Sequence, residues 1–257
     1  MCTLSLFPSR EGLIITMNRD ERRDRQELNT LVTKDDQERG VSMSYSVDLV
    51  SGGTWFGMNS SGLVAALLNR YQEYCPSARQ SRGLIIPQLL KQCSAQAVDN
   101  AINRLDWLAF APCDLVFVGQ SQARCYCWNG SVLQMMEIAL DRGWFISSSS
   151  ERLDEVIQYR RDLFDAFVHA HQAAGPSAKN ILNELHLLQD SDNASSSINM
   201  SRPHSHTKSI SRVIIEKDRM QYDYFNEKAL AEFDPKQPWR AGVQQIFYPQ
   251  ALTGIAL

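Results

Sequence analysis

The second residue of the chain, Cys2, is the strongest candidate for a chemical role. A thiol is the most nucleophilic ordinary side chain, and its pKa is about 8.5. Removal of Met1 before this small residue would give Cys2 a free α-amine with a pKa of about 7.7–8.0, which suits it to take the thiol proton. The sequence therefore predicts a thiol-centred site at the N-terminus. The other interpretation is an incidental cysteine at position 2.

A polar and charged run, Asn18-Arg19-Asp20-Glu21, ends the second predicted strand. A positive group beside a thiol favours the thiolate, and a carboxylate can orient an amine. Arg19 is therefore predicted to tune the thiol or bind a carboxylate, and Asp20 to hold the amine. The alternative is a solvated strand end. Asn69 follows a later apolar run, where its amide is predicted to stabilise an oxyanion or only to cap a turn.

The elements that position these residues begin with two predicted strands, residues 2–7 and 12–18, around a turn at residues 8–12. Residues 21–48 are polar and are predicted to form a long loop. Residues 52–68 are predicted to form a hairpin whose turn covers residues 59–62. This arrangement would bring the end of the second strand beside Cys2.

Helical and strand-like patterns follow one another through the rest of the chain. Helices are predicted after Pro76, from Ser94 to about residue 105, from about 150 to about 172, and over 178–188. Strands are predicted between residues 114 and 147, with a turn at Asn129-Gly130, and at 209–216 and 221–225, after a loop at 190–206. Because strands and helices do not alternate one by one, this order predicts antiparallel sheets covered by helices.

Composition and charge exclude several classes of protein. The 257-residue chain has 26 basic and 29 acidic residues and no basic patch, so no nucleic-acid partner is expected. No apolar stretch approaches the roughly 18 residues of a membrane span, and the start does not have the pattern of a signal peptide. We therefore expect a cytoplasmic protein whose 6 cysteines are thiols. Residues 1–257 are expected to form one domain, with residues from about 227 to 257 as a C-terminal extension packed on it.

Several motifs in order carry a family resemblance: Met-Cys-Thr at the start, Asn18-Arg19-Asp20-Glu21, Gly-Thr-Trp-Phe-Gly-Met-Asn at 53–59, and the segment from Gly62 to Asn69. Together they resemble the NRDE family, also called the transport and Golgi organisation protein 2 family. Weaker matches continue at residues 81–83, 144–149 and 207–211. The resemblance implies an α+β fold of the N-terminal nucleophile hydrolase type, a four-layer αββα sandwich of two antiparallel sheets.

The same opening is similar to the bile salt hydrolase and penicillin V acylase group, which cleaves amides through an N-terminal cysteine. By this resemblance Cys2 matches the nucleophile, Asp20 the carboxylate near its amine, and Asn69 the oxyanion amide. Two positions depart from that pattern. Met17 stands where the acylases have an arginine, and a serine run that includes Ser148 stands where they have a second oxyanion asparagine. Substrate contacts are expected from Asn18, Trp55, Asn59 and Ser148.

Two functions follow as hypotheses. The first is a cysteine amidohydrolase that cleaves a non-peptide C–N bond of a small-molecule substrate and needs no metal or cofactor. The second is a non-catalytic trafficking protein for haem, or for an acyl lipid, which the family resemblance suggests. Cys2, His204 and His206 are candidate iron ligands for haem. A scaffold domain with a relict pocket is a third interpretation, and the oligomeric state stays open.

Overall fold

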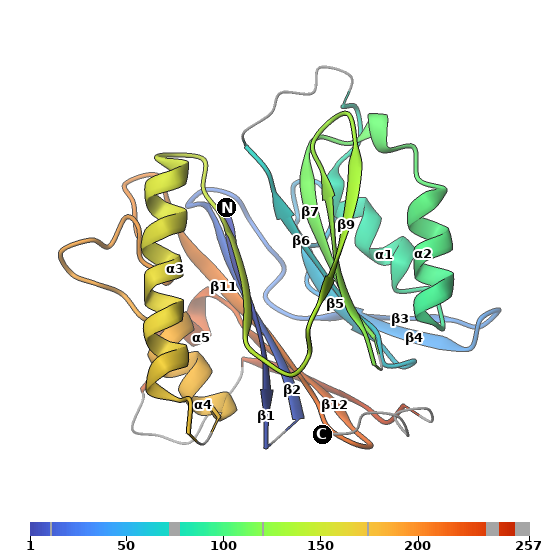
Figure 1. Cartoon of the computed structure of the whole chain (residues 1–257). Coiled ribbons are helices and arrows are strands. Elements are labelled where there is room, and N and C mark those ends of the chain that lie inside the picture. Colours follow the sequence, from blue (N-terminus) through green and yellow to red (C-terminus); the bar gives the residue numbers. More distant parts are fainter. Residues whose placement is uncertain (11, 72–77, 120, 174, 235–241, 250–257) are drawn as a thin grey trace.

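The computed structural model describes residues 1–257 except 11, 72–77, 120, 174, 235–241 and 250–257. Two antiparallel sheets face each other, and helices cover their outer faces (Figure 1). This arrangement confirms the predicted α+β sandwich. Among the described residues, no helix has both the length and the apolar character that a bilayer span requires.

The first sheet has six strands and contains the N-terminus. Its order is β10 (Trp144–Ser148), β1 (Cys2–Ser9), β2 (Gly12–Arg22), β11 (Ser205–Ile215), β12 (Met220–Phe225) and β13 (Val243–Phe247). β1 therefore lies inside the sheet, between β2 and β10. β13, within the predicted C-terminal extension, pairs with β12 and forms the far edge.

The second sheet has seven strands in chain order: β3 (Val32–Asp36), β4 (Val41–Tyr45), β5 (Phe56–Asn59), β6 (Val64–Asn69), β7 (Cys113–Val118), β8 (Ala123–Trp128) and β9 (Leu133–Ile138). The prediction of a long loop over residues 21–48 is wrong, because β3 and β4 lie within it. β3 is a polar, largely exposed edge strand. Its sequence therefore lacks the apolar alternation by which a half-buried strand is recognised.

The helices form the two outer layers. α3 (Leu153–Ala170), α4 (Ala178–Asn180), the π-helical turn η3 (Ile181–His186) and α5 (Glu227–Ala231) lie against the six-stranded sheet. The 3₁₀ turn η1 (Arg82–Leu84), α1 (Ile85–Leu89), α2 (Ala95–Asn103) and η2 (Trp107–Ala109) belong to the seven-stranded side. Ser94 caps α2 as predicted, because its side chain accepts a hydrogen bond from the Ala97 amide.

Alternation along β1 divides its side chains between two buried faces. Cys2, Leu4 and Leu6 point into the core between the sheets. Phe7 packs in the helix-side core with α3. Since a strand turns successive side chains to opposite faces, Thr3 and Ser5 share the helix side with Phe7. By the same rule, Arg19 on β2 faces the side of Cys2, whereas Asn18 and Asp20 face the helix side.

Candidate functional site

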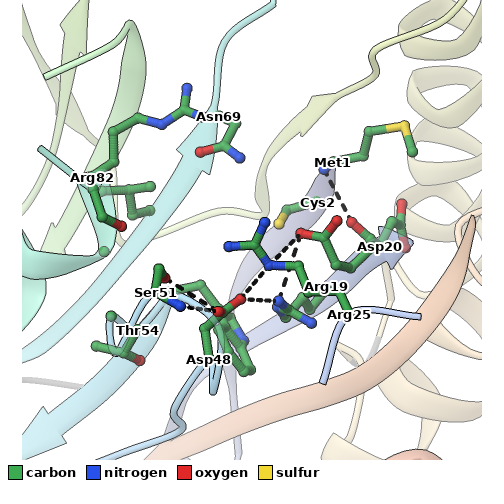
Figure 2. Close-up of a pocket in the computed structure, with 16 residues that line it drawn as sticks. Met1, Cys2, Arg19, Asp20, Arg25, Asp48, Ser51, Thr54, Asn69 and Arg82 are labelled. Atoms are coloured by element: carbon green, nitrogen blue, oxygen red, sulfur yellow. Dashed lines mark hydrogen bonds and ion pairs between the residues drawn. The ribbon is translucent and has the colours of Figure 1, made fainter. Parts of the chain in front are cut away.

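A pocket with a volume of about 130 Å³ opens beside Cys2, between the ends of the two sheets (Figure 2). Strand β6 of the seven-stranded sheet lies close to β1 and β10 here. The pocket is lined by Met1, Cys2, Arg19, Asp20, Glu21, Arg25, Asp48, Ser51, Gly53, Thr54, Trp55, Leu67, Asn69, Ser81, Arg82 and Gly83. It brings together five of the eight site residues predicted from the sequence: Cys2, Arg19, Asp20, Trp55 and Asn69.

Cys2 is held between two strands. It lies opposite Arg19 on β2 and opposite Ser148 on β10. Its backbone N–H donates to the Ser148 hydroxyl at 3.1 Å, so Ser148 contacts the nitrogen of the predicted nucleophile. Burial raises the pKa of the Cys2 thiol, and the nearby Met1 ammonium and Arg19 only partly oppose this shift. The thiol is therefore protonated at neutral pH and needs a base to become a nucleophile.

Met1 is buried together with its charge. Its ammonium donates to the backbone carbonyl of Asp20 at 3.1 Å and to the Tyr71 hydroxyl at 2.9 Å. Burial alone would lower the pKa of this ammonium, but Tyr71, Cys2 and Asp20 raise it above its ordinary value. The thioether of Met1 accepts from the Arg202 guanidinium at 3.1 Å.

Arg19 belongs to a buried ion network on the pocket side of β2. Its guanidinium bonds Glu27 at 2.8 Å and Asp48 at 2.6 Å, and it stacks over the Trp55 ring with 4.3 Å to the centroid. Asp48 also bonds Arg25 at 2.6 Å. Because protein carboxylates already occupy its donors, Arg19 fits the predicted tuning of the thiol better than the binding of a substrate carboxylate.

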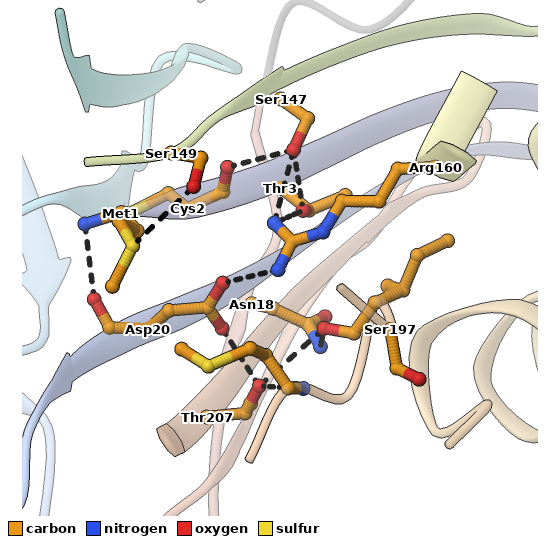
Figure 3. A network of polar contacts seen from close by, with 12 residues as sticks. Met1, Cys2, Thr3, Asn18, Asp20, Ser147, Ser149, Arg160, Ser197 and Thr207 are labelled. Atoms are coloured by element: carbon orange, nitrogen blue, oxygen red, sulfur yellow. Dashed lines mark hydrogen bonds and ion pairs between the residues drawn. The ribbon is translucent and has the colours of Figure 1, made fainter. Parts of the chain in front are cut away.

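Asp20 turns its carboxylate to the helix side of the hairpin (Figure 3). One oxygen accepts from Arg160 at 3.0 Å and the other from the Thr207 hydroxyl at 2.7 Å. Arg160, from α3, is fully buried and also donates to the hydroxyls of Thr3 and Ser147. With Met1 present, the group that Asp20 offers the amine is therefore its backbone carbonyl and not its carboxylate.

The opposite wall of the pocket comes from the seven-stranded sheet. Asn69, at the end of β6, and Arg82, at the start of η1, lie across from Cys2 (Figure 2). The side-chain amide of Asn69 donates to the Tyr71 hydroxyl at 3.4 Å. Its position across the pocket fits the predicted oxyanion donor.

Three residues predicted to contact substrate are not among the lining residues of the pocket: Asn18, Asn59 and Ser148. Asn18 is fully buried on the helix side, where its amide donates to the carbonyls of His186 and Ile198. Asn59 organises the β5–β6 turn by accepting from the amides of Ser61 and Leu63. Strand alternation explains the first case, and turn chemistry explains the second.

The sequence did not single out Asp48, Arg82 or Arg160 as site residues. Asp48 falls in the segment interpreted as a loop, and Arg160 stands next to a second arginine in a helix, where no pattern distinguishes the two. A contact between two glycines brings Arg82 to the pocket, since Gly53 lies against Gly83. That contact joins segments thirty residues apart, which no local pattern reveals.

The described residues contain no group of three or more His, Cys, Asp or Glu side chains arranged to hold a metal ion. The predicted iron ligands separate in space: Cys2 lines the pocket, but no histidine is among the lining residues. His206 instead contacts Glu227 at 2.7 Å. The described cysteines, which exclude Cys75, are free thiols as predicted.

The family model for Transport and Golgi organisation 2 (TANGO2) matches residues 1–229. The chain belongs to this family. No curated protein matches this chain by sequence. Among solved structures, it is similar to the Caenorhabditis elegans ortholog of N-acylethanolamine-hydrolyzing acid amidase, with a TM-score of 0.56 and 14% identity over 83% of this chain and 92% of that chain.

A second similar structure is a variant of the conjugated bile acid hydrolase from Clostridium perfringens. The TM-score is 0.53 and the identity 10%, over 96% of this TANGO2-family chain and 97% of that chain. At such identities the likeness shows the fold alone, which is that of the N-terminal nucleophile hydrolases.

Proposed function

We propose that this TANGO2-family protein is a cysteine amidohydrolase that cleaves a non-peptide C–N bond once Met1 has been removed. One observation carries the proposal. The Cys2 thiol lies in a pocket, with its own nitrogen on the Ser148 hydroxyl and the Asn69 amide on the wall across from it. A nucleophile, its base and an oxyanion donor are the three parts that acyl transfer requires.

In the first half of the reaction, the free α-amine of Cys2 takes the thiol proton. The thiolate sulfur attacks the amide carbon, and the carbonyl oxygen becomes an oxyanion that accepts from the Asn69 side chain. When the tetrahedral intermediate collapses, its C–N bond breaks. The departing nitrogen receives the proton from the α-ammonium, which leaves a thioester on Cys2.

In the second half, water replaces the departed amine. The α-amine takes a proton from this water, whose oxygen attacks the thioester carbon. Collapse of the second intermediate breaks the C–S bond, releases the carboxylic acid, and returns the proton to sulfur. Ser148 is the positioning residue in both halves, because its hydroxyl is the acceptor for the Cys2 nitrogen at 3.1 Å.

The electrostatics of the site support a base that acts during the reaction. Burial raises the pKa of the Cys2 thiol, so little thiolate exists before substrate binds. A raised thiol pKa also makes the thiolate, once formed, a stronger nucleophile. Arg19 opposes the shift and stabilises the thiolate.

The names of the two similar enzymes support the choice of bond. One is named for hydrolysis of N-acylethanolamines and the other for hydrolysis of conjugated bile acids. Both names describe hydrolases, and both enzymes share the fold that presents Cys2 here. We therefore take a small N-acyl amide as the substrate class to test.

The experiment compares two forms prepared from cleavable fusions, one beginning at Cys2 and the other at Met1. Each is incubated with a panel of N-acyl amides, and the released amine is measured. Activity is expected only in the form that begins at Cys2. Cys2→Ala abolishes it, and Asn69→Ala lowers kcat about 10²-fold with folding unchanged, as removal of one oxyanion donor does. Equal activity in the two forms, or activity that survives Cys2→Ala, would refute the proposal.

Carriage of haem or an acyl lipid is the second candidate function, and it applies to a form of the chain that retains Met1. With Met1 in place, the Cys2 nitrogen is a peptide nitrogen and cannot act as a base. Titration of the Met1 form with haem, followed by its Soret band, tests carriage. A spectrum unchanged by Cys2→Ala would remove Cys2 as the ligand.

A further inference from the structure

We infer that Arg82 anchors an anionic group, a carboxylate or a phosphate, on the molecule that occupies the Cys2 pocket. The inference rests on the proposed function, because it takes this pocket as the substrate site. It adds the chemical class of the substrate: an amide that also carries a negatively charged group. The support comes from how the charges around the pocket are paired.

Two of the three arginines that line the pocket are occupied by protein carboxylates. Arg19 bonds Glu27 and Asp48, and Arg25 bonds the same oxygen of Asp48 at 2.6 Å. The remaining carboxylates of the pocket are also engaged. Glu21 lies 3.6 Å from Arg19, and Asp20 is bonded by Arg160. No acidic side chain of the pocket therefore compensates Arg82.

Arg82 itself makes one hydrogen bond within the described part of the chain. Its Nη1 donates to the backbone carbonyl of Pro112 at 2.7 Å. A guanidinium has five N–H donors in a planar fork that matches a carboxylate or a phosphate. The bond to Pro112 fixes the direction of this fork and leaves most of its donors for a ligand.

The backbone that carries Arg82 is fixed on the pocket wall. The Thr54 amide donates to the Gly83 carbonyl at 3.0 Å, and a Cβ added at Gly53 would stand 2.8 Å from the Gly83 Cα. This close approach requires glycine at both positions. A fixed backbone reduces the entropy lost on binding, as an anchor residue requires.

One further group on the pocket offers a donor to the same ligand. Asn69 lies beside Arg82 on the wall across from Cys2 (Figure 2).

The first test uses the unaltered protein and does not require Cys2 to react. Arginines are modified with phenylglyoxal in chloride, acetate or phosphate at equal ionic strength, and each site is quantified by peptide mass. Arg82 is expected to react in chloride and to be protected by acetate, phosphate or both. Arg79, exposed and paired with Asp106 outside the pocket, is the reference and is expected to show no anion-specific protection.

The pattern of protection distinguishes the two ligand chemistries. Protection by acetate alone indicates a carboxylate, and protection by phosphate alone indicates a phosphate. Absence of protection by both anions overturns the inference. This outcome leaves the proposed hydrolysis standing, because Cys2 takes no part in the measurement.

The second test compares iodoacetate with its neutral counterpart iodoacetamide as alkylating agents for Cys2. Arg82→Gln is expected to lower the ratio of the two rates at Cys2 about tenfold, the size of a charge-assisted hydrogen bond. Arg82→Lys is expected to lower this ratio of alkylation rates less than Arg82→Gln does, and Arg79→Gln is expected to leave it unchanged. Exposed Cys93 is the reference in the same molecule.

An unchanged ratio in Arg82→Gln overturns the inference. If neither reagent alkylates Cys2, the proposed nucleophile fails, and the protection test still decides whether Arg82 binds an anion. The two proposals can thus fail separately.

Discussion

The two faces of the β1–β2 hairpin treat polar groups in opposite ways. On the helix side, Arg160 is fully buried and bonds the Asp20 carboxylate, the Thr3 and Ser147 hydroxyls and the Ser196 carbonyl. On the pocket side, Arg82 has one hydrogen-bond acceptor among the described residues, the Pro112 carbonyl. Both sides border the hairpin that carries Cys2.

This difference separates scaffold from site. A buried polar network whose members are paired rigidifies the structure around it. Donors left without acceptors in a pocket are instead complementary to a ligand. The helix side therefore fixes the hairpin that presents Cys2, and the pocket side supplies groups that meet a substrate.

The largest expected effect is acid destabilisation through the helix side. His186 accepts from Ser5 and donates to Asn18, each at 2.6 Å, and burial together with Arg212 lowers its pKa from 6.5 to about 3. Between these values the unfolded state binds more protons than the folded state, so acidification favours unfolding. The free energy of unfolding is expected to fall by about 1.4 kcal/mol for each pH unit below about 6.5, and by about 5 kcal/mol in all by pH 3.

Urea denaturation followed by tryptophan fluorescence between pH 5 and 7 measures this slope. His186→Gln cannot titrate and is expected to lose that part of the slope. The exposed His169→Gln is the control and is expected to retain it. If His186→Gln keeps the wild-type slope, protonation of His186 does not cause the loss of stability in acid, and the prediction is wrong.

The next effect compares the two arginines directly. Arg160→Met leaves the buried Asp20 carboxylate without its cation and is expected to cost about 3–5 kcal/mol of unfolding free energy. Arg82→Met removes one partly exposed hydrogen bond and is expected to cost about 1 kcal/mol or less. Urea midpoints of both variants check this contrast. Equal losses would contradict the division into scaffold and site.

The smallest effect sharpens the role of the pocket wall. Gly53→Ala places a methyl group against the Gly83 backbone and is expected to cost about 1–3 kcal/mol, as overpacking does. The substitution should also move Arg82, so that acetate or phosphate protects it less against phenylglyoxal. Gly119→Ala is the matched control, because its new methyl group meets side chains and no backbone, the Phe117 ring at 3.1 Å and Leu63 at 3.5 Å. Unaltered protection in Gly53→Ala would show that the wall does not position Arg82.

The sequence predicted the parts of the fold that have a strong local period. The strands around Cys2, the hairpin that ends at Asn69 and the long helix α3 were expected and are present. β3 was missed, because a polar edge strand has no buried face to mark it. β4 was missed although Val41, Met43 and Tyr45 alternate with serines and pack in the core, because its five residues follow directly on the polar segment. Turn chemistry made the β5–β6 hairpin recognisable, since Asn59 and Gly62 are typical turn residues.

The candidate site was predictable where its residues lie on two strands that follow each other in the chain. Cys2 on β1 pairs with Arg19 on β2 for this reason. The orientation of Asp20 was not foreseen, because its partners Arg160 and Thr207 come from distant elements. Arg82 depends on the contact between Gly53 and Gly83, and such tertiary contacts leave no trace in local sequence.

The position of β1 inside its sheet has a consequence for the order of events during folding. β1 and β2 are neighbours in the chain, but β10 beside β1 and β11 beside β2 lie more than 120 residues further along it. Contacts of such long sequence separation form slowly. The strand that carries Cys2 therefore reaches its final place in the sheet late, when most of the chain has already assembled around it.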